Sequence, residues 1–212
     1  MAREFGKTIM GTSGPDELQG TDYADSIYGY EGNDLLDGAG GNDRLMAHDG
    51  NDRLYGRAGD DTLYGGFGDD VLDGGTGHDR LWGGPGNDRL TGGDGADLFN
   101  FSALYWTDQM QGVALITDFQ SGTDMIDLSR FDADERTAPG TIKGKNTPGN
   151  EAFQLVQSTD EVTPGHLVIK PGVDAFGNPV TMVLGYTDTE PGPDIVIYLG
   201  GSPPITAADF IF

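Results

Sequence analysis

Aspartate recurs at a fixed spacing through the first half of this sequence, and carboxylates in such number can bind a hard cation. When residues 11–100 are written as ten rows of nine, the sixth position of every row is aspartate. These residues are Asp16, Asp25, Asp34, Asp43, Asp52, Asp61, Asp70, Asp79, Asp88 and Asp97. The whole chain has 35 acidic and 12 basic side chains, a net charge of −23. This charge favours cations as partners and argues against nucleic acid, whose phosphates are bound largely by Lys and Arg.

The eighth position of each row predicts the elements that hold these aspartates. It is large and apolar in all ten rows, as Leu18, Ile27, Leu36, Leu45, Leu54, Leu63, Leu72, Leu81, Leu90 and Phe99. Positions seven to nine form a three-residue strand that buries this side chain, and the glycine-rich positions one to six form a turn. Because such a strand is not stable alone, the rows must stack, with two rows per coil. The sequence therefore predicts an all-β fold, a parallel β-roll solenoid over residues 11–100 after a lead-in of residues 1–10.

Stacking brings the carboxylates of alternate rows close together. At roughly the strand spacing of 4.8 Å like charges repel, and protonation near pH 7 requires large pKa shifts. A divalent cation between rows n and n+2 removes the repulsion. Ca2+ fits best, because it accepts about six to eight oxygens in a flexible geometry, whereas Mg2+ requires a tight octahedron. We expect about eight ions, which would bring the net charge to about −7, an ordinary value for a soluble protein.

The rows follow the pattern GGxGxDxUx, where U is large and apolar, and they resemble the calcium-binding repeat of RTX proteins. The resemblance implies that one row supplies the carbonyls of positions two and four, the other row those of positions one and three, and both rows an aspartate. Besides the ten aspartates, the metal-site residues implied in this way are Gly29, Glu31, Gly32, Gly38, Gly40, Gly41, His48, Gly50, Gly56, Arg57, Ala58, Gly59, Gly65, Gly66, Phe67, Gly68, Gly74, Gly75, Thr76, Gly77, Gly83, Gly84, Pro85, Gly92 and Asp94.

Some rows depart from this pattern at the glycine positions. Tyr23 replaces the glycine of position four, and a bulky residue resists positive φ. The second glycine is replaced in the first six rows, by Thr12, Thr21, Tyr30, Ala39, His48 and Arg57. A backbone carbonyl remains after each replacement. We therefore expect the best sites toward residues 56–97 and the weakest in the first two rows.

Residues 101–212 lose the nine-residue period but keep β-type runs separated by Gly and Pro. The runs are residues 113–117, 125–128, 153–156, 166–170, 180–184 and 195–199. Because an open solenoid end exposes strand edges and apolar core, this segment is expected to form a β cap. Asp118 and Asp124 lie in a DFxxGxD turn. We interpret them as turn-forming residues, with one further calcium site as the alternative.

The segments GGDGADLFNF, ITDFQSGTDMIDLSRFD and ITAADFIF resemble the C-terminal region of serralysin-type metalloproteases, over about residues 11–212. The resemblance implies an uncleaved type I secretion signal at Asp209, Phe210, Ile211 and Phe212, with the type I secretion machinery as a partner. The start of the chain has no apolar run typical of a secretory signal, which agrees with this route. The leading hypothesis is a secreted, extracellular calcium-binding module that is unfolded in the cytosol and folds on export.

The catalytic half of those proteases has no counterpart in this sequence. Their HExxH motif needs two His four residues apart, and the His here are His48, His78 and His166. The sequence contains no Cys, which excludes disulfides and thiolate metal sites, and no window of about 18 apolar residues for a membrane span. We expect no catalytic residues and no enzymatic activity. An alternative is that the chain is the non-catalytic tail of a larger exoenzyme, such as a protease, lipase or epimerase.

A stripe of outward-facing side chains suggests a second surface. The ninth positions of alternate rows are Tyr28, Met46, Tyr64 and Trp82, and an apolar stripe of this size is usually covered. The C-terminal segment, a second chain or a ligand would each cover it. Aromatic rings flanked by Arg suit polysaccharide, as in the RTX modules of alginate epimerases, which these repeats also resemble. A polysaccharide-binding adhesin module is therefore the alternative function.

Overall fold

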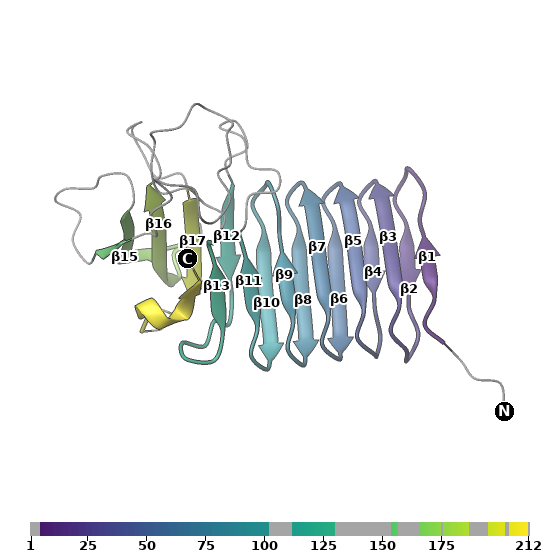
Figure 1. Ribbon diagram of the computed structural model, residues 1–212. Coiled ribbons are helices and arrows are strands. Elements are labelled where there is room, and N and C mark those ends of the chain that lie inside the picture. The colour runs from purple at the N-terminus through teal and green to yellow at the C-terminus, as the bar shows by residue number, and fades with distance from the viewer. Residues whose placement is uncertain are drawn as a thin grey trace, which may run out of the picture.

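The computed structural model describes residues 5–101, 112–129, 154–156, 166–174, 176–186, 195–201 and 204–211. These segments consist of strands and turns apart from one 3-10 turn, η1 (Ala207–Asp209). Within them, no helix has the length and apolar character needed to span a bilayer. The strands build an elongated solenoid that begins at the N-terminal end of the chain and passes into a second group of strands (Figure 1).

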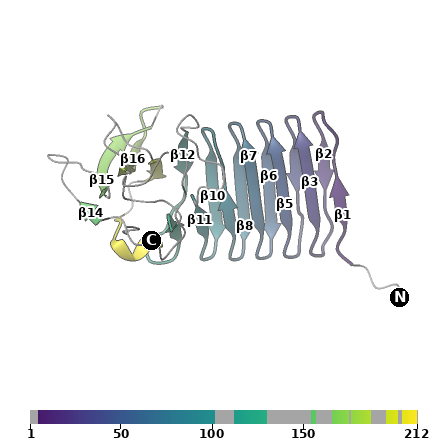
Figure 2. The ribbon, with the colours of Figure 1, turned by 45° about the horizontal axis from the view of Figure 1, so that its top comes forward.

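Two parallel sheets form the solenoid, and consecutive rows alternate between them (Figures 1 and 2). Sheet A runs in the order β1 (Thr8–Met10), β3 (Ser26–Glu31), β5 (Arg44–Asp49), β7 (Thr62–Phe67), β9 (Arg80–Trp82), β11 (Leu98–Asn100), β13 (Met125–Asp127) and β18 (Phe210–Ile211). The roll part of sheet B contains β2 (Glu17–Gln19), β4 (Leu35–Asp37), β6 (Arg53–Ala58), β8 (Val71–Thr76) and β10 (Arg89–Asp94). Leu45 pairs with Leu63 and Leu54 with Leu72, so each row stacks on the second row after it. The predicted all-β fold and parallel β-roll are confirmed.

Most strands of the roll are longer than the three residues predicted. In β3, β5, β6, β7, β8 and β10 the strand covers six residues, from position seven of one row to position three of the next. His48, for example, pairs with Gly66 and Asp49 with Phe67. The prediction was wrong because it treated the glycine-rich positions as a turn only. Parallel pairing between neighbouring coils continues around the corner, so these positions also contribute to the ladder.

The interior of the roll is one cluster of apolar side chains, to which the two sheets contribute alternately along the chain. The eighth-position residues from Ile27 to Phe99 are fully buried. Leu18 and Ile9, in the outermost strands, are only partly buried, because each has a neighbouring coil on one side. Each row thus buries one large side chain, and its stability depends on the rows beside it.

The roll extends beyond the ten rows at both ends. At the start, β1 pairs with β3 and places Lys7 at the position that aspartate holds in later rows. At the other end, β12 (Val113–Ile116) pairs with β10, and β13 pairs with β11. Sheet B then continues through β17 (Ile195–Gly200), β16 (Pro179–Tyr186), β15 (His166–Val173) and β14 (Gln154–Val156), with antiparallel pairing on both sides of β16. All six β-type runs predicted after residue 100 contain a strand.

Candidate metal centre

The row aspartates form a hydrogen-bonded ladder along the turns. From Asp16 to Asp79, the backbone N–H of each row aspartate donates to Oδ1 of the aspartate 18 residues later, as from Asp43 to Asp61 at 2.7 Å and from Asp61 to Asp79 at 2.8 Å. Nine of the ten predicted aspartates are buried, and Asp16 in the first row is partly exposed. The local fold therefore brings the predicted carboxylates together and uses one oxygen of each for the ladder.

The second oxygen of most of these carboxylates has no partner. Among the described residues, Oδ2 is buried without any hydrogen bond in Asp34, Asp43, Asp52, Asp61, Asp70, Asp79 and Asp97. A buried polar atom left unsatisfied costs about 1–3 kcal/mol, and more when it carries charge. Because the same atom carries this cost in seven rows, we infer that a further group binds these oxygens. A cation is the natural ligand of a carboxylate oxygen that has no hydrogen-bond donor.

The electrostatics of the ladder also favour a cation. Burial raises the pKa of Asp70 to about 8; the Asp52 N–H opposes the shift, and the Asp88 carboxylate adds to it. Burial likewise raises the pKa to about 7 in Asp61 and Asp88 and to about 6 in Asp43, Asp52 and Asp79. Near neutral pH, ionising these buried carboxylates therefore destabilises the folded roll. A bound divalent cation would remove this destabilisation.

Backbone carbonyls complete the candidate sites. No group of three or more His, Asp or Glu side chains that could hold a metal occurs in the described segments, so an ion here would need backbone oxygens as well. In the predicted pair of rows seven and nine, the Gly66 N–H donates to the Gly83 carbonyl at 2.9 Å and the Gly68 N–H to the Pro85 carbonyl at 3.1 Å. A carbonyl oxygen has a second lone pair, which remains for a metal. The predicted donors therefore lie together, and the residues present fit a calcium ion.

Glycine at position one keeps two of these oxygens close together. A Cβ at Gly65 would collide with Asp70 Oδ2 and would lie 2.6 Å from the Gly83 carbonyl oxygen. The unpartnered carboxylate oxygen and a carbonyl of the next coil therefore face the same small space. Ala47 holds this position in row five, and its side chain is buried there.

The turn conformation is the same in rows three to ten. Positions two and four have positive φ in each of these rows, including four residues that are not glycine: Tyr30, Ala39, His48 and Arg57, with φ between 72° and 80°. The predicted contributors Glu31, Ala58, Phe67, Thr76 and Asp94 have exposed side chains, so their backbone faces the neighbouring coil. For example, the carbonyls of Thr76 and Asp94 accept the N–H groups of Gly59 and Gly77.

The aspartates at the ends of the array are satisfied by protein donors. Asp118 accepts the N–H groups of Gly92 and Gly93, at 3.0 and 2.8 Å, and Asp124 accepts those of Asp97 and Gln120, at 3.1 and 2.8 Å. Asp124 thus ends the aspartate ladder, and Asp118 binds two glycine N–H groups of the last row. At the first rows, burial raises the pKa of Asp25, but hydrogen bonds from Lys7 and Thr21 hold it below its ordinary value.

A second ladder at position five was missed by the sequence analysis. Side-chain acceptors there receive the backbone N–H of the residue 18 positions later, as Asn33 Oδ1 does from Asn51 at 2.9 Å and His78 Nδ1 does from Ala96 at 2.9 Å. The other acceptors are Asn42, Asn51, Asp60 and Asp69. The signal was present, because position five is Asn, Asp or His from row three to row nine.

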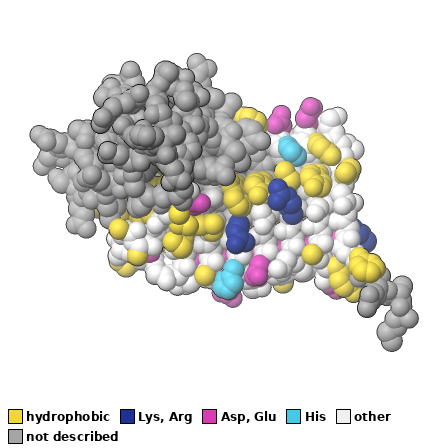
Figure 3. Space-filling model, in the orientation of Figure 1, with side chains coloured by type: hydrophobic (Ala, Val, Ile, Leu, Met, Phe, Trp, Pro, Cys, Tyr) yellow, Lys and Arg dark blue, Asp and Glu magenta, His cyan; other side chains and the backbone are white. Residues whose placement is uncertain are grey.

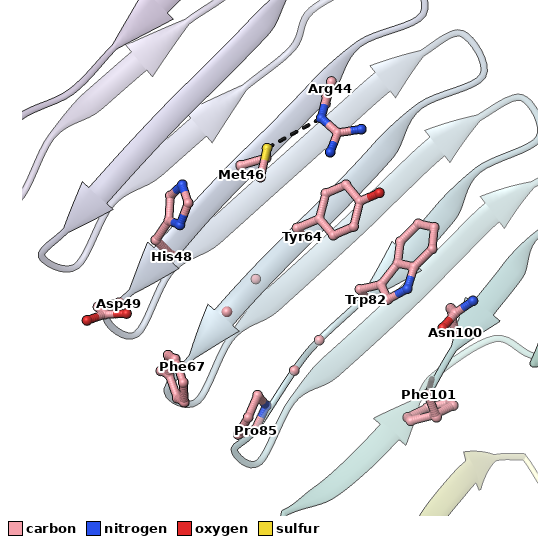
Figure 4. Close-up of a pocket in the computed structure, with 14 residues that line it drawn as sticks. Arg44, Met46, His48, Asp49, Tyr64, Phe67, Trp82, Pro85, Asn100 and Phe101 are labelled. Atoms are coloured by element: carbon pink, nitrogen blue, oxygen red, sulfur yellow. Dashed lines mark hydrogen bonds between the residues drawn. The ribbon is translucent and has the colours of Figure 1, made fainter. Parts of the chain in front are cut away.

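The outward stripe forms one wall of a groove of about 360 Å³ on sheet A (Figure 4). The Tyr64 and Trp82 rings stack with centroids 4.6 Å apart, and the Arg44 guanidinium lies 4.7 Å from the Tyr64 ring centre. Gly66 and Gly84 leave the floor beside the rings without side chains. Hydrophobic side chains gather in a stripe on this face, next to Lys or Arg side chains (Figure 3). Tyr28 lies outside the groove and stacks on Tyr30 at 6.4 Å.

Comparison with known proteins identifies the repeat. The RTX calcium-binding nonapeptide repeat matches in four overlapping stretches, residues 10–45, 37–72, 46–81 and 73–103. The comparison with curated proteins gave no match. Among solved structures, the chain is similar to the AlgE6R3 and AlgE6R2 subunits of the Azotobacter vinelandii mannuronan C5-epimerase. It is 23% identical to each. The alignments cover 95% of this chain and 80% of AlgE6R3, with a TM-score of 0.35, and 96% of this chain and 91% of AlgE6R2, with a TM-score of 0.34. The family match spans all ten rows, so residues 10–103 carry RTX calcium-binding nonapeptide repeats.

Proposed function

We propose that calcium bound between alternate rows holds the roll folded, and that this folding switch is the function of the chain. The observation that carries the proposal is the set of seven buried Oδ2 atoms without a partner. Rows seven and nine give one complete example, in which Asp70 and Asp88 supply carboxylate oxygens. The carbonyls of residues 66, 68, 83 and 85 supply the rest, and the same positions in the other rows whose Oδ2 has no partner form the remaining sites.

Each part of the turn has a defined role in this proposal. In the folded roll, Oδ1 joins neighbouring coils through the backbone ladder. Oδ2 faces the space that the glycine of position one leaves open. Calcium, when bound, supplies positive charge to oxygens that cannot be hydrated. Without it, the buried carboxylates repel one another, and the extended chain, in which water solvates them, is favoured.

Secretion gives this switch a biological use. Free calcium in the cytosol is far below the range in which weaker oxygen sites fill, whereas extracellular modules bind at about 10⁻⁴ to 10⁻³ M. We propose that the chain crosses the type I secretion machinery unfolded and folds outside the cell. The resemblance of its last residues to the secretion signals of serralysin-type proteases supports this route. The described residues serve binding in this account, and we assign them no catalytic step.

Circular dichroism tests the folding switch directly. We expect the calcium-free chain to lack most of its strand signal and to regain it cooperatively at millimolar Ca2+. Each site whose Kd is exceeded about 100-fold adds roughly 2.7 kcal/mol to the folded state, so several sites make the transition steep. Mg2+ at the same concentration serves as the control and should restore little signal, because it requires a tighter octahedral site. A full strand signal in the calcium-free chain would exclude the proposal.

The groove on sheet A favours a second candidate function, binding of an extracellular polysaccharide. The stacked Tyr64 and Trp82 rings form an apolar wall, and Arg44 beside them suits acidic sugars. We expect the double variant Tyr64→Ala and Trp82→Ala to keep calcium-induced folding and to lose retention on an acidic polysaccharide such as polyuronate. A control variant, Tyr55→Ala, removes an aromatic ring from the other sheet and should keep both properties. Equal retention of wild type and double variant would exclude this candidate.

A further inference from the structure

The first two rows satisfy their aspartates differently from the later rows. Thr12 donates its backbone N–H and its hydroxyl to Asp16 Oδ2, at 2.5 and 3.0 Å. Thr21 makes the same two bonds to Asp25 Oδ2, at 2.5 and 2.9 Å. The oxygen that has no partner in seven later rows therefore receives two donors from its own row here.

The backbone of these two rows differs as well. Thr12 and Thr21 at position two do not have the positive φ found at this position in rows three to ten. In row seven, the positive φ of Gly66 turns its N–H outward to the Gly83 carbonyl, at 2.9 Å. In row two, the N–H of Thr21 instead points inward to Asp25.

The absence of glycine alone does not explain this difference. Tyr30 and Arg57 also replace the glycine of position two, yet both have positive φ, at 80° and 79°. Threonine is β-branched, which makes positive φ unfavourable, and its short side chain carries a hydroxyl that can reach the carboxylate. Threonine at this position therefore fixes the inward conformation and supplies the second donor.

We propose that threonine at position two closes a calcium site and makes its row independent of the ion. This inference rests on the proposed calcium-binding function and concerns which rows carry it out. The two donors, one N–H and one O–H, occupy the lone pairs of Oδ2. Their positive ends also repel a cation. The pairs that begin in rows one and two then hold no ion, which leaves about six of the eight pairs that stacking allows.

The other end of sheet A is closed in a similar way. Asp209, in the turn before the last strand, accepts the N–H and the hydroxyl of Thr206 at Oδ2, at 2.7 and 3.0 Å. Its Oδ1 accepts the N–H of Gly122, at 2.8 Å. The ion-dependent rows therefore lie between two ends whose carboxylates are satisfied by the protein.

Isothermal titration calorimetry of the full chain with CaCl2 tests the inference through the number of ions bound. The double variant Thr21→Gly and Tyr23→Gly restores the glycines of row two. We expect it to bind one ion more than wild type, because residues 21 and 23 and Asp25 then complete a site with row four. An unchanged number of ions, with the strand signal retained, overturns the inference.

A matched pair of variants in row three tests the same idea in reverse. Tyr30→Thr introduces the closing residue, whereas Tyr30→Asn keeps a residue that tolerates positive φ. We expect Tyr30→Thr to bind one ion fewer than Tyr30→Asn. Equal numbers for the two variants contradict the inference even if the row-two variant does not fold. If wild type itself binds no calcium, the proposed function fails and this inference with it; if wild type binds but the variants do not differ, the inference fails alone.

Discussion

The two oxygens of each row aspartate have separate roles, and Asp70 allows them to be tested separately. Asp70→Asn keeps the oxygen that accepts the Asp52 N–H at 2.9 Å and replaces Oδ2 with an amide. At a calcium concentration about 100 times the wild-type Kd, the substitution should lower the free energy of unfolding by about 2.7 kcal/mol for each site that no longer binds calcium. In calcium-free buffer the variant should be at least as stable as wild type, because a buried charge is removed. Urea unfolding at saturating calcium measures the first effect, and the strand signal that remains in calcium-free buffer, read by circular dichroism, measures the second.

The neighbouring aspartate gives a matched control for this prediction. Asp69 carries the same charge, and its Oδ1 accepts the Asn87 N–H at 2.8 Å in the position-five ladder. Asn can replace it in that role, as Asn51 already does in row five. Asp69→Asn should therefore change calcium-dependent stability by less than about 0.5 kcal/mol, as surface substitutions usually do. Equal losses in the two variants would show that overall charge, and not Oδ2, accounts for the effect.

The raised pKa values of the row aspartates predict opposite pH dependences with and without calcium. The pKa of an unfolded aspartate is about 3.9, whereas burial raises the pKa of Asp61 to about 7 and of Asp70 to about 8 in the folded chain. Between these values the calcium-free folded state binds more protons than the unfolded state. Its stability is therefore full below about pH 4 and is lost as pH rises toward 8.

Calcium competes with these protons, so its affinity should rise over the same pH range. In calcium-free buffer the strand signal in circular dichroism should fall from pH 5 to pH 8, and calorimetry with calcium should give a falling Kd over the same range. A calcium-free stability that is constant or rises with pH would contradict the burial of these carboxylates. Asp70→Asn should flatten the calcium-free profile near pH 8.

The turns of rows three to ten require positive φ at positions two and four, and a glycine-to-alanine substitution tests this requirement. Gly68 has φ 125°, and a Cβ there would collide with the Gly50 carbonyl of the neighbouring coil. We expect Gly68→Ala to destabilise the calcium-bound roll by about 1–3 kcal/mol. Gly14 holds the same position in row one, but its φ is not positive and a Cβ there would meet no atom within 4 Å. Gly14→Ala should be neutral or stabilising by about 0.4–1 kcal/mol, as thermal unfolding would measure, and equal effects would contradict the assigned turn geometry.

The strands and their pairing could be predicted from the sequence because one residue type at one position decides them. A buried apolar side chain at every ninth residue permits a single register, so Leu54 pairs with Leu72 as expected. The conformation of the turns was harder to predict from the sequence. The strands continue over positions one to three, where side chains as different as Arg57 and Gly75 pair, and no hydrophobic pattern marks this extension.

The candidate site was likewise predictable in part from the sequence. The aspartates and the glycine positions followed from spacing, but the use of Oδ1 for the ladder did not, since composition does not distinguish the two oxygens of a carboxylate. The roles of Thr12 and Thr21 also depend on a backbone angle that only the folded turn fixes. Our proposal of side-chain closure therefore gives the weak sites expected in the first two rows a different cause from the loss of glycine on which that prediction was based.

At the scale of the whole molecule, the roll combines a narrow core with a large charge. Each row buries one apolar residue, so the contact between neighbouring coils, and not the row itself, provides stability. An ion between two rows adds to that contact directly. Because each inner aspartate faces a coil on both sides, filling one site should favour folding of the next, and the calcium transition should be cooperative.

Salt can distinguish this local role of calcium from simple neutralisation of the net charge of −23. About 1 M NaCl shortens the Debye length to about 3 Å and screens exposed charges, but buried pairs are screened much less. The unpartnered Oδ2 atoms are buried, so we expect NaCl to restore only a small part of the strand signal of the calcium-free chain, while millimolar CaCl2 restores it fully. Circular dichroism measures secondary structure in this comparison, and small-angle scattering measures compaction. KCl serves as the control for any effect specific to sodium. If monovalent salt alone produces the compact, strand-rich chain, repulsion between exposed charges is what keeps it unfolded, and the buried oxygens between the coils do not require a metal.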